Sequence, residues 1–306
     1  MTIDPTSGPA IHSGRTTRTL MVHVVVALLP ICVAAIWRHG SHAAILLGVS
    51  IFTALVLDTI CDRRNASEGI SIVIGIVLAL LLPITAPWWT AAVGSAMAVV
   101  IGKHAFGGIG NNLFNPAALG RVLLMAVAPK HFLSPQWEVD AITLATPLAK
   151  ELGARQVEIG PLLLGEQTVA LGEAAPLAVL AGGIALVALR KTDWLMPLVY
   201  LATISILALL LPGSARTAGH APWLEGNALL HLLSGGAMLA AFFMVTDPVT
   251  TPFTRSGSMS FCVLAAAYTM VVRYYTPYPD AVVIGLVLAN ATVPIIDRAT
   301  LGKFVA

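Results

Sequence analysis

The chain has 306 residues, of which 57% are hydrophobic and only 10% are charged, and its mean hydropathy is +0.86. Soluble domains contain about 25% charged residues, so the composition excludes an ordinary soluble enzyme and predicts an all-α integral membrane protein. The net charge is only +2, and no long run of Lys and Arg interrupts the chain. We therefore expect no nucleic acid among its partners.

Apolar segments follow one another along most of the sequence. The tail 1–18 is polar, and the apolar run after it is too long for a cleaved signal peptide and has no small-residue cleavage site. We predict ten membrane spans, at 20–37, 43–60, 69–86, 88–102, 112–128, 174–189, 194–212, 227–246, 258–275 and 280–297. Several are shorter than the roughly 20 residues that cross a bilayer, so we expect extended ends and some broken helices.

Five predicted spans precede one long polar segment and five follow it. The expected parts are a cytoplasmic tail, a first membrane half, an outer loop and a second membrane half, at 1–18, 19–128, 129–173 and 174–306. An odd number of spans in each half predicts two inverted halves. Glu68-Gly69 and Glu225-Gly226 open the third and eighth spans, and they give faint support for such a repeat.

The distribution of Lys and Arg predicts the orientation, because cytoplasmic loops carry an excess of both. With a cytoplasmic N-terminus, ten of these residues lie inside and six outside: Arg15, Arg18, Arg63, Arg64, Lys103, Arg190, Lys191, Arg255, Arg298 and Lys303 against Arg38, Lys130, Lys150, Arg155, Arg216 and Arg273. Both termini are then cytoplasmic, and the acidic loop 129–173 faces the periplasm or cell exterior.

The outer loop contains the stretch Asp140-Ala-Ile-Thr-Leu-Ala-Thr-Pro-Leu148. Thr146-Pro147 is typical of a helix start, since threonine caps the first turn and proline suits the first helical position. The residue before a proline is also held extended, which presents the Thr146 hydroxyl for modification. The two interpretations are compatible, because a phosphate on the cap would face the free N–H groups of a helix N-terminus.

A second stretch, Gly102–Arg121, combines closely spaced glycines with Asn111, Asn112 and Asn115. The glycines allow close approach of a ligand or a neighbouring helix. Amide groups near the start of a membrane segment need hydrogen-bond partners. Either the amides contact a ligand, or they cap the break before Pro116.

A third stretch, Phe242–Pro252, places Asp247 among three threonines at the end of the eighth predicted span. These oxygens could bind a hard cation, although an Asp-Pro pair at a helix end is more often a turn.

Arg121 is the most informative charged residue within the predicted spans, because a guanidinium keeps its charge and needs an anionic or carbonyl partner. Asp58 and Asp297 are the candidate partners for a structural pair. His23 and His231 are expected to be hydrogen-bonded residues at helix interfaces, and no metal site is predicted. Cys32, Cys61 and Cys262 lack paired or metal-ligand spacing and are expected to be buried thiols, with an iron–sulfur ligand shared with a partner subunit as the alternative.

The stretch 140–148 resembles the flavinylation motif of membrane subunits that carry FMN on a threonine, with Leu144 where the motif usually has Gly or Ser. These are the D subunit of the Rnf electron-transport complex and the B subunit of the Na⁺-translocating NADH:quinone reductase. Both other stretches are also similar to segments of this family. The resemblance implies FMN esterified to Thr146 within the motif, and a second, noncovalent riboflavin. The expected cofactor-binding residues are Thr146, Asp140, Thr143, Ala145, Arg121, Asn111 and Asn115.

The resemblance implies one electron relay in a ferredoxin:NAD⁺ oxidoreductase of the bacterial inner membrane, coupled to Na⁺ or H⁺ movement. The chain shows no complete active site of its own, so hydride transfer would belong to partners. Those partners are iron–sulfur subunits, a second covalent-flavin subunit and an NADH-binding subunit, with a flavin transferase during maturation. The quinone reductase subunit, a small-solute channel or carrier, and a flavin-free scaffold subunit stay open as alternatives.

Overall fold

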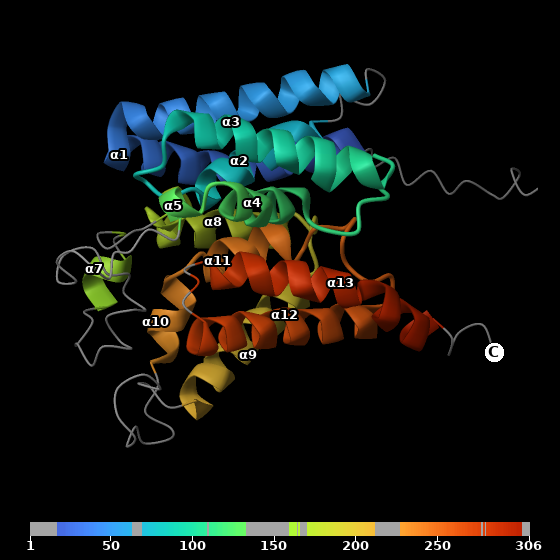
Figure 1. The fold of residues 1–306 in the computed structure, drawn as a ribbon. Coiled ribbons are helices and arrows are strands. Elements are labelled where there is room, and N and C mark those ends of the chain that lie inside the picture. The colour runs from blue at the N-terminus through green and yellow to red at the C-terminus, as the bar shows by residue number, and fades with distance from the viewer. Residues whose placement is uncertain are drawn as a thin grey trace, which may run out of the picture.

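The computed structural model describes residues 17–62, 69–108, 110–132, 159–163, 165, 170–211, 227–276, 278 and 280–301. Within these ranges the regular structure is helical, apart from one isolated antiparallel bridge between Pro83 and Ala170 (Figure 1). The prediction of an all-α chain is confirmed.

The first group of helices begins with α1, Thr17–Cys61, which has two arms that meet at Gly40. Gly40 has φ 65° and ψ −146°, a conformation that glycine adopts readily, and the second arm folds back along the first (Figure 1). The other elements are α2 (Ile70–Leu81), α3 (Trp88–Met97), the π-helix η2 (Ala98–Lys103), the short η3 (His104–Phe106), α4 (Pro116–Val127) and α5 (Pro129–Phe132).

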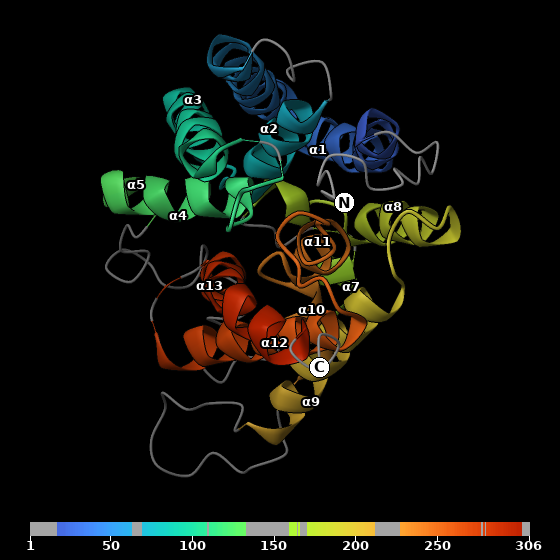
Figure 2. The ribbon, with the colours of Figure 1, turned by 90° about the vertical axis from the view of Figure 1, so that its right-hand side faces the viewer.

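The second group lies on the other side of the molecule in Figures 1 and 2, with α8 and α11 near the junction. Its elements are α7 (Ile159–Leu163), η4 (Leu171–Glu173), α8 (Pro176–Ala188), α9 (Leu195–Leu210), α10 (Ala228–Leu233), α11 (Ala237–Leu239), the π-helix η5 (Ala240–Met244), α12 (Arg255–Tyr275) and α13 (Ala281–Leu301). Each predicted apolar segment coincides with one or more of these helices. The eighth is broken, since Gly235 and Gly236 adopt positive φ between α10 and α11.

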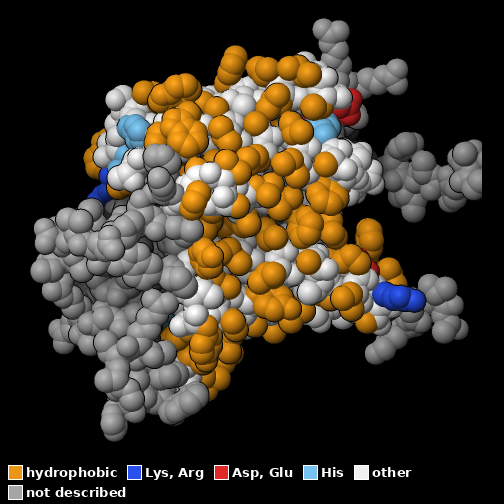
Figure 3. All heavy atoms as spheres, in the orientation of Figure 1, with side chains coloured by type: hydrophobic (Ala, Val, Ile, Leu, Met, Phe, Trp, Pro, Cys, Tyr) orange, Lys and Arg blue, Asp and Glu red, His pale blue; other side chains and the backbone are white. Residues whose placement is uncertain are grey.

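Three helices of the described chain are long and apolar enough to cross a membrane, namely α1, α12 and α13. Four shorter apolar helices of 10–17 residues accompany them: α2, α4, α8 and α9. Hydrophobic side chains cover much of the visible surface in Figure 3, and the few charged ones lie toward its ends. Such a surface is typical of a protein whose solvent is lipid.

Two helix pairs pack with their backbones in close contact. A Cβ atom on Gly120 of α4 would lie 2.8 Å from the carbonyl oxygen of Gly94 in α3, and one on Gly285 of α13 would lie 2.6 Å from the backbone nitrogen of Thr269 in α12. Small residues allow such close packing where no hydrophobic effect drives helices together. The α3–α4 and α12–α13 pairs are therefore fixed by their glycines, and α4 also contacts α13 across the junction.

Arg273 holds the break between α10 and α11. Its guanidinium donates to the carbonyl oxygen of His231 at 2.6 Å and to that of Ser234 at 2.8 Å. The ring of His231 in turn lies 3.2 Å from the hydroxyl of Tyr274. Carbonyls at a helix end have no partner within the helix, so the arginine supplies the missing donors. His231 is a hydrogen-bonded interface residue, as predicted.

We expect Arg273→Met to lower the free energy of unfolding by about 3 kcal/mol, because buried carbonyls lose charged donors. Thermal unfolding of the purified protein in detergent measures the loss. Arg255→Met is the matched control, since the Arg255 side chain is 68% exposed and its ion pair with Asp193 is long, at 3.5 Å. This substitution should lower the free energy of unfolding by at most about 1 kcal/mol. Equal melting temperatures for the two variants would contradict this role of Arg273.

Candidate functional site

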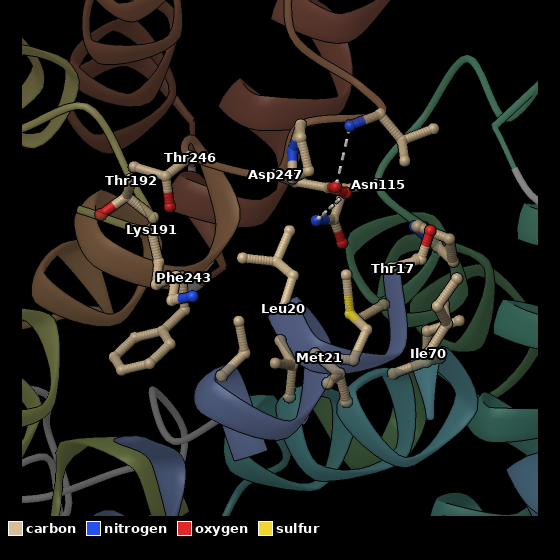
Figure 4. A pocket seen from close by; sticks show the side chains of 18 of the residues that line it. Thr17, Leu20, Met21, Ile70, Asn115, Lys191, Thr192, Phe243, Thr246 and Asp247 are labelled. Atoms are coloured by element: carbon tan, nitrogen blue, oxygen red, sulfur yellow. Dashed lines mark hydrogen bonds between the residues drawn. The ribbon is translucent and has the colours of Figure 1, made fainter. Parts of the chain in front are cut away.

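A pocket of about 480 Å³ lies between the two groups of helices (Figure 4). Its walls come from the start of α1, from α2, from the segment leading into α4, from the turn between α8 and α9, and from η5 with the turn that follows it. The pocket therefore uses residues that are far apart in the sequence. The pocket forms only when the two groups of helices pack against each other.

One part of the pocket is apolar and another is cationic. Leu20, Met21 and Phe243 point toward the space in Figure 4. Arg190 and Lys191 line it from the turn after α8, and Lys103 lines it from the end of η2. Among the described residues Arg190 is the one non-glycine with positive φ, at 53°. Such a conformation is uncommon outside glycine and clusters at functional sites.

Asp247 holds a hydrogen-bond network at the pocket wall. Its carboxylate accepts from the backbone N–H of Val249 at 3.1 Å, from the hydroxyl of Thr250 at 3.3 Å and from the Asn115 amide at 3.4 Å. Burial raises the pKa of the Asp247 carboxyl, and the bonds from Val249 and Thr250 offset part of that rise. The backbone and hydroxyl bonds confirm the turn predicted at Asp-Pro. The Asp247 side chain also lines the pocket.

Asn115 joins the two groups of helices. Its side-chain oxygen accepts from the N–H of Ala118 at 3.2 Å and caps α4, with Pro116 at the first helical position. Its own N–H donates to the side-chain oxygen of Asn290 in α13 at 3.1 Å, and Asn290 donates to the carbonyl of Thr250. The sequence left a cap or a ligand contact open for Asn115. The structure shows the cap and also places Asn115 in the pocket wall.

The other two asparagines of this stretch separate. Asn111 is exposed, donates to the carbonyl of Gly107 at 3.4 Å and does not line the pocket, whereas Asn112 does. The sequence alone does not predict a place in this site for Lys103, Arg190 or Lys191. Residue type alone does not indicate that these three cations lie together, because their meeting at one pocket depends on how the two groups of helices pack.

Arg121 lies apart from the pocket lining. It is 1% exposed, forms an ion pair with Asp280 and packs 4.0 Å from the ring centre of Phe132. Its Nε and Nη1 atoms have no hydrogen-bond partner among the described residues. A buried guanidinium with unused donors can bind a phosphate or another anion.

The predicted partners of Arg121 were wrong. Asp58 pairs with Lys103, and Asp297 accepts from the backbone N–H of Phe253 at 2.9 Å. The reason is the position of each carboxylate along its helix. Asp280 directly precedes α13 and contacts the middle of α4. Asp58 and Asp297 lie near the C-terminal ends of α1 and α13.

Further predicted residues have mixed outcomes. Asp140, Thr143, Ala145 and Thr146 lie outside the described residues. Cys32 and Cys262 are buried as expected, but Cys61 is exposed because it ends α1, so that prediction was wrong. His23 bonds to the carbonyl of Thr19 within its own helix and not across an interface.

The fold and the pocket define a helical membrane protein with an amphipathic cavity between two groups of helices. The model of the NQR2, RnfD, RnfE family matches residues 5–305, and the chain belongs to this family. It is 34% identical to the D subunit of the Na⁺-translocating ferredoxin:NAD⁺ oxidoreductase complex of Acetobacterium woodii, over 96% of this chain and 92% of that protein.

Two further relatives agree. The D subunit of an ion-translocating oxidoreductase complex of Stutzerimonas stutzeri is 35% identical over 91% of this chain and 89% of its own length. The D subunit of the proton-translocating ferredoxin:NAD⁺ oxidoreductase complex of Clostridium ljungdahlii is 30% identical over 96% and 93%. The resemblance inferred from the three sequence stretches is confirmed.

Proposed function

We propose that this chain is the membrane-embedded D subunit of an ion-translocating ferredoxin:NAD⁺ oxidoreductase complex and relays electrons within it. The observation that carries the proposal is the family match over 5–305, with relatives named as this subunit over nearly the whole chain. The relatives named for Na⁺ and for protons are 34% and 30% identical, so identity does not select the ion. The partners are iron–sulfur subunits, a second covalent-flavin subunit and an NADH-binding subunit.

The proposed architecture has ten helices in two inverted halves in the bacterial inner membrane, with both termini cytoplasmic and loop 129–173 periplasmic. Two structural features support it. The glycine-packed pairs α3–α4 and α12–α13 occupy corresponding places at the ends of the two groups. In addition, Lys103, Arg190 and Lys191, all expected on the cytoplasmic side, line one pocket.

The proposed covalent cofactor is FMN, esterified through its phosphate to Thr146 by a flavin transferase. Arg121 supports this proposal through its position in the chain fold. It contacts Phe132, and Phe132 is the last described residue before the segment that contains Thr146. Its unused N–H donors fit a phosphate or a negatively charged ring. Bound there, FMN would supply transfer of one or two electrons, and Arg121 would favour the reduced form electrostatically.

The proposed second cofactor is noncovalent riboflavin in the pocket. The volume of about 480 Å³ lies within the range of roughly 300–1,000 Å³ that is typical of small-molecule sites. Apolar walls such as Phe242 and Phe243 fit the ring system, and Asn112, Asn115 and Asp247 offer amide and carboxylate groups to its polar edge. These residues would bind and orient the ring and exclude water from it.

We expect Val24→Trp to fill the pocket and to reduce the noncovalent flavin more than tenfold, while covalent flavin stays at the wild-type level. The measurement is flavin released by acid from the purified complex, compared with flavin left on the polypeptide. Val26→Trp is the matched control, because Val24 lines the pocket and Val26, one half-turn away on the same helix, is 58% exposed on the outside. Equal release from the two variants would mean that the pocket does not hold the flavin.

The activity of the purified complex separates the alternatives. Electron exchange between ferredoxin and NAD⁺ supports the proposal, whereas quinone reduction by NADH would indicate the related sodium pump. A small-solute carrier would show neither reaction and no flavin on the denatured polypeptide. A scaffold subunit would assemble into an active complex without any flavin of its own.

A further inference from the structure

A buried cluster of ionisable side chains stands beside the pocket. Asp58 of α1 is 2% exposed and accepts three hydrogen bonds, from Nζ of Lys103 at 2.6 Å, from Nε2 of His104 at 2.7 Å and from the Ser71 hydroxyl. Lys103 and His104 bond to the same carboxylate oxygen, Oδ1. No other titratable side chain contacts this carboxylate among the described residues, and Ser71 is the group that faces it from α2.

The cluster connects the pocket with the outside of the protein. Lys103 is 1% exposed and lines the pocket, while the side chain of His104 is 15% exposed. The π-helix η2 ends at Lys103, and a 3₁₀ turn starts at His104, so two consecutive side chains reach one carboxylate. Such π-segments are rare and often mark functional sites. A proton that binds His104 is one hydrogen bond from Asp58, and Asp58 is one hydrogen bond from the pocket wall.

The charges of the cluster suggest what it does. Asp58 and Lys103 cancel each other when His104 is neutral, so the resting cluster carries no net charge. An electron that enters the pocket adds a negative charge in a region of low dielectric, which is costly unless a positive charge accompanies it. A proton added to Asp58 would leave the charge of Lys103 uncompensated at the pocket wall.

We propose that Asp58, Lys103 and His104 form a redox-linked proton site, in which Asp58 takes up one proton through His104 when the first electron is held in the pocket. This rests on the proposed function, since it needs a redox group there. The electron comes from the ferredoxin-linked chain and the proton from the solvent. The Asp58–H bond forms as the transient His104 imidazolium loses its proton, and the pair of electron and proton leaves the net charge unchanged. Reoxidation returns the proton by the same route.

Other charges around the pocket do not replace this cluster. Arg190 and Lys191 lie in the turn between α8 and α9 and Asp247 lies after η5, so they face the pocket from the second group of helices. The geometry shows no contact between them and Asp58. Asp247 is thus the competing proton acceptor, and the test must separate the two carboxylates.

The test is infrared difference spectroscopy of the purified complex, reduced against oxidised, in the carbonyl-stretch region of protonated carboxylic acids. In the wild type we expect a band on reduction, scaled to the noncovalent flavin that is bound. In Asp58→Asn this scaled band is absent. In Asp247→Asn, whose side chain lines the pocket, the band falls only as far as the bound flavin falls. His104→Gln keeps a hydrogen bond to Asp58 but cannot pass a proton, so the band should form at least tenfold more slowly and recover with added imidazole.

The variants also separate folding from function. Asp58→Asn leaves Lys103 buried without its counter-charge, so the double variant Asp58→Asn, Lys103→Gln removes both charges and preserves polar contacts. Because Lys103 lines the pocket, the noncovalent flavin of this variant is measured as well, and the infrared band scaled to that flavin should be absent. A band that persists in this variant, or that vanishes only in Asp247→Asn, would overturn the proton site while leaving the flavin proposal intact. A wild-type complex that releases no noncovalent flavin would overturn both.

Discussion

Thr146→Ala is expected to remove all covalently bound flavin from this polypeptide, because without the hydroxyl oxygen no phosphoester can form. On a denaturing gel the wild-type band should fluoresce under ultraviolet light, and the variant band should be dark. The expression host must contain a flavin transferase. Electron exchange between ferredoxin and NAD⁺ should fall to background in the variant complex.

Thr168→Ala is the control for this variant, since it changes a threonine of the same loop outside the stretch Asp140–Leu148 and leaves the acceptor hydroxyl in place. It should keep a fluorescent band. A fluorescent Thr146→Ala band would place the flavin on another residue. A dark band together with full electron transfer would support the scaffold alternative.

Replacing Arg121 should have the largest effect on stability. Arg121→Met leaves the carboxylate of Asp280, 18% exposed in its side chain, without its cationic partner, and breaking a buried pair in this way costs about 3–5 kcal/mol. The variant also loses the contact with the ring of Phe132. Thermal unfolding in detergent should show a strongly lowered melting temperature.

A double-mutant cycle separates the ion pair from the rest of the site. Asp280→Asn alone should also destabilise, and the combined Arg121→Met, Asp280→Asn variant should lose less than the sum of the two single losses. Additive losses would mean that the two side chains are energetically independent. If Arg121 also binds the FMN, Arg121→Met should shift the flavin potential downward, whereas Arg121→Lys keeps the positive charge and should retain more of both the stability and the potential.

The sequence was sufficient for the helices, and the reasons are local. Long apolar runs must form helices in lipid, because every backbone N–H and C=O needs an internal partner. The break at Asn115-Pro116 could be predicted because the amide caps the helix and proline suits its first turn. What could not be predicted was that the helices at 20–37 and 43–60 meet directly at Gly40, with no loop between them. Glycine permits that conformation without requiring it.

Long-range pairings account for most of what was missed. Arg121 needed a carboxylate, as its chemistry demands, but which one depended on how α4 lies against the start of α13. Asp58 and Lys103 are 45 positions apart and meet only because α1 folds back and η2 ends beside it. Hydrophobic patterning determines which face of a helix is buried, but it does not determine which polar groups on two buried faces will meet.

Mass spectrometry of the tryptic peptide 131–150 tests most directly whether Thr146 carries FMN, as we propose. Lys130 and Lys150 flank this peptide, and no other Lys or Arg lies within it. We expect a mass increased by one FMN less one water, with the fragment ions locating the addition on Thr146. The unmodified mass, measured in a complex that is active and carries its other flavins, would contradict it.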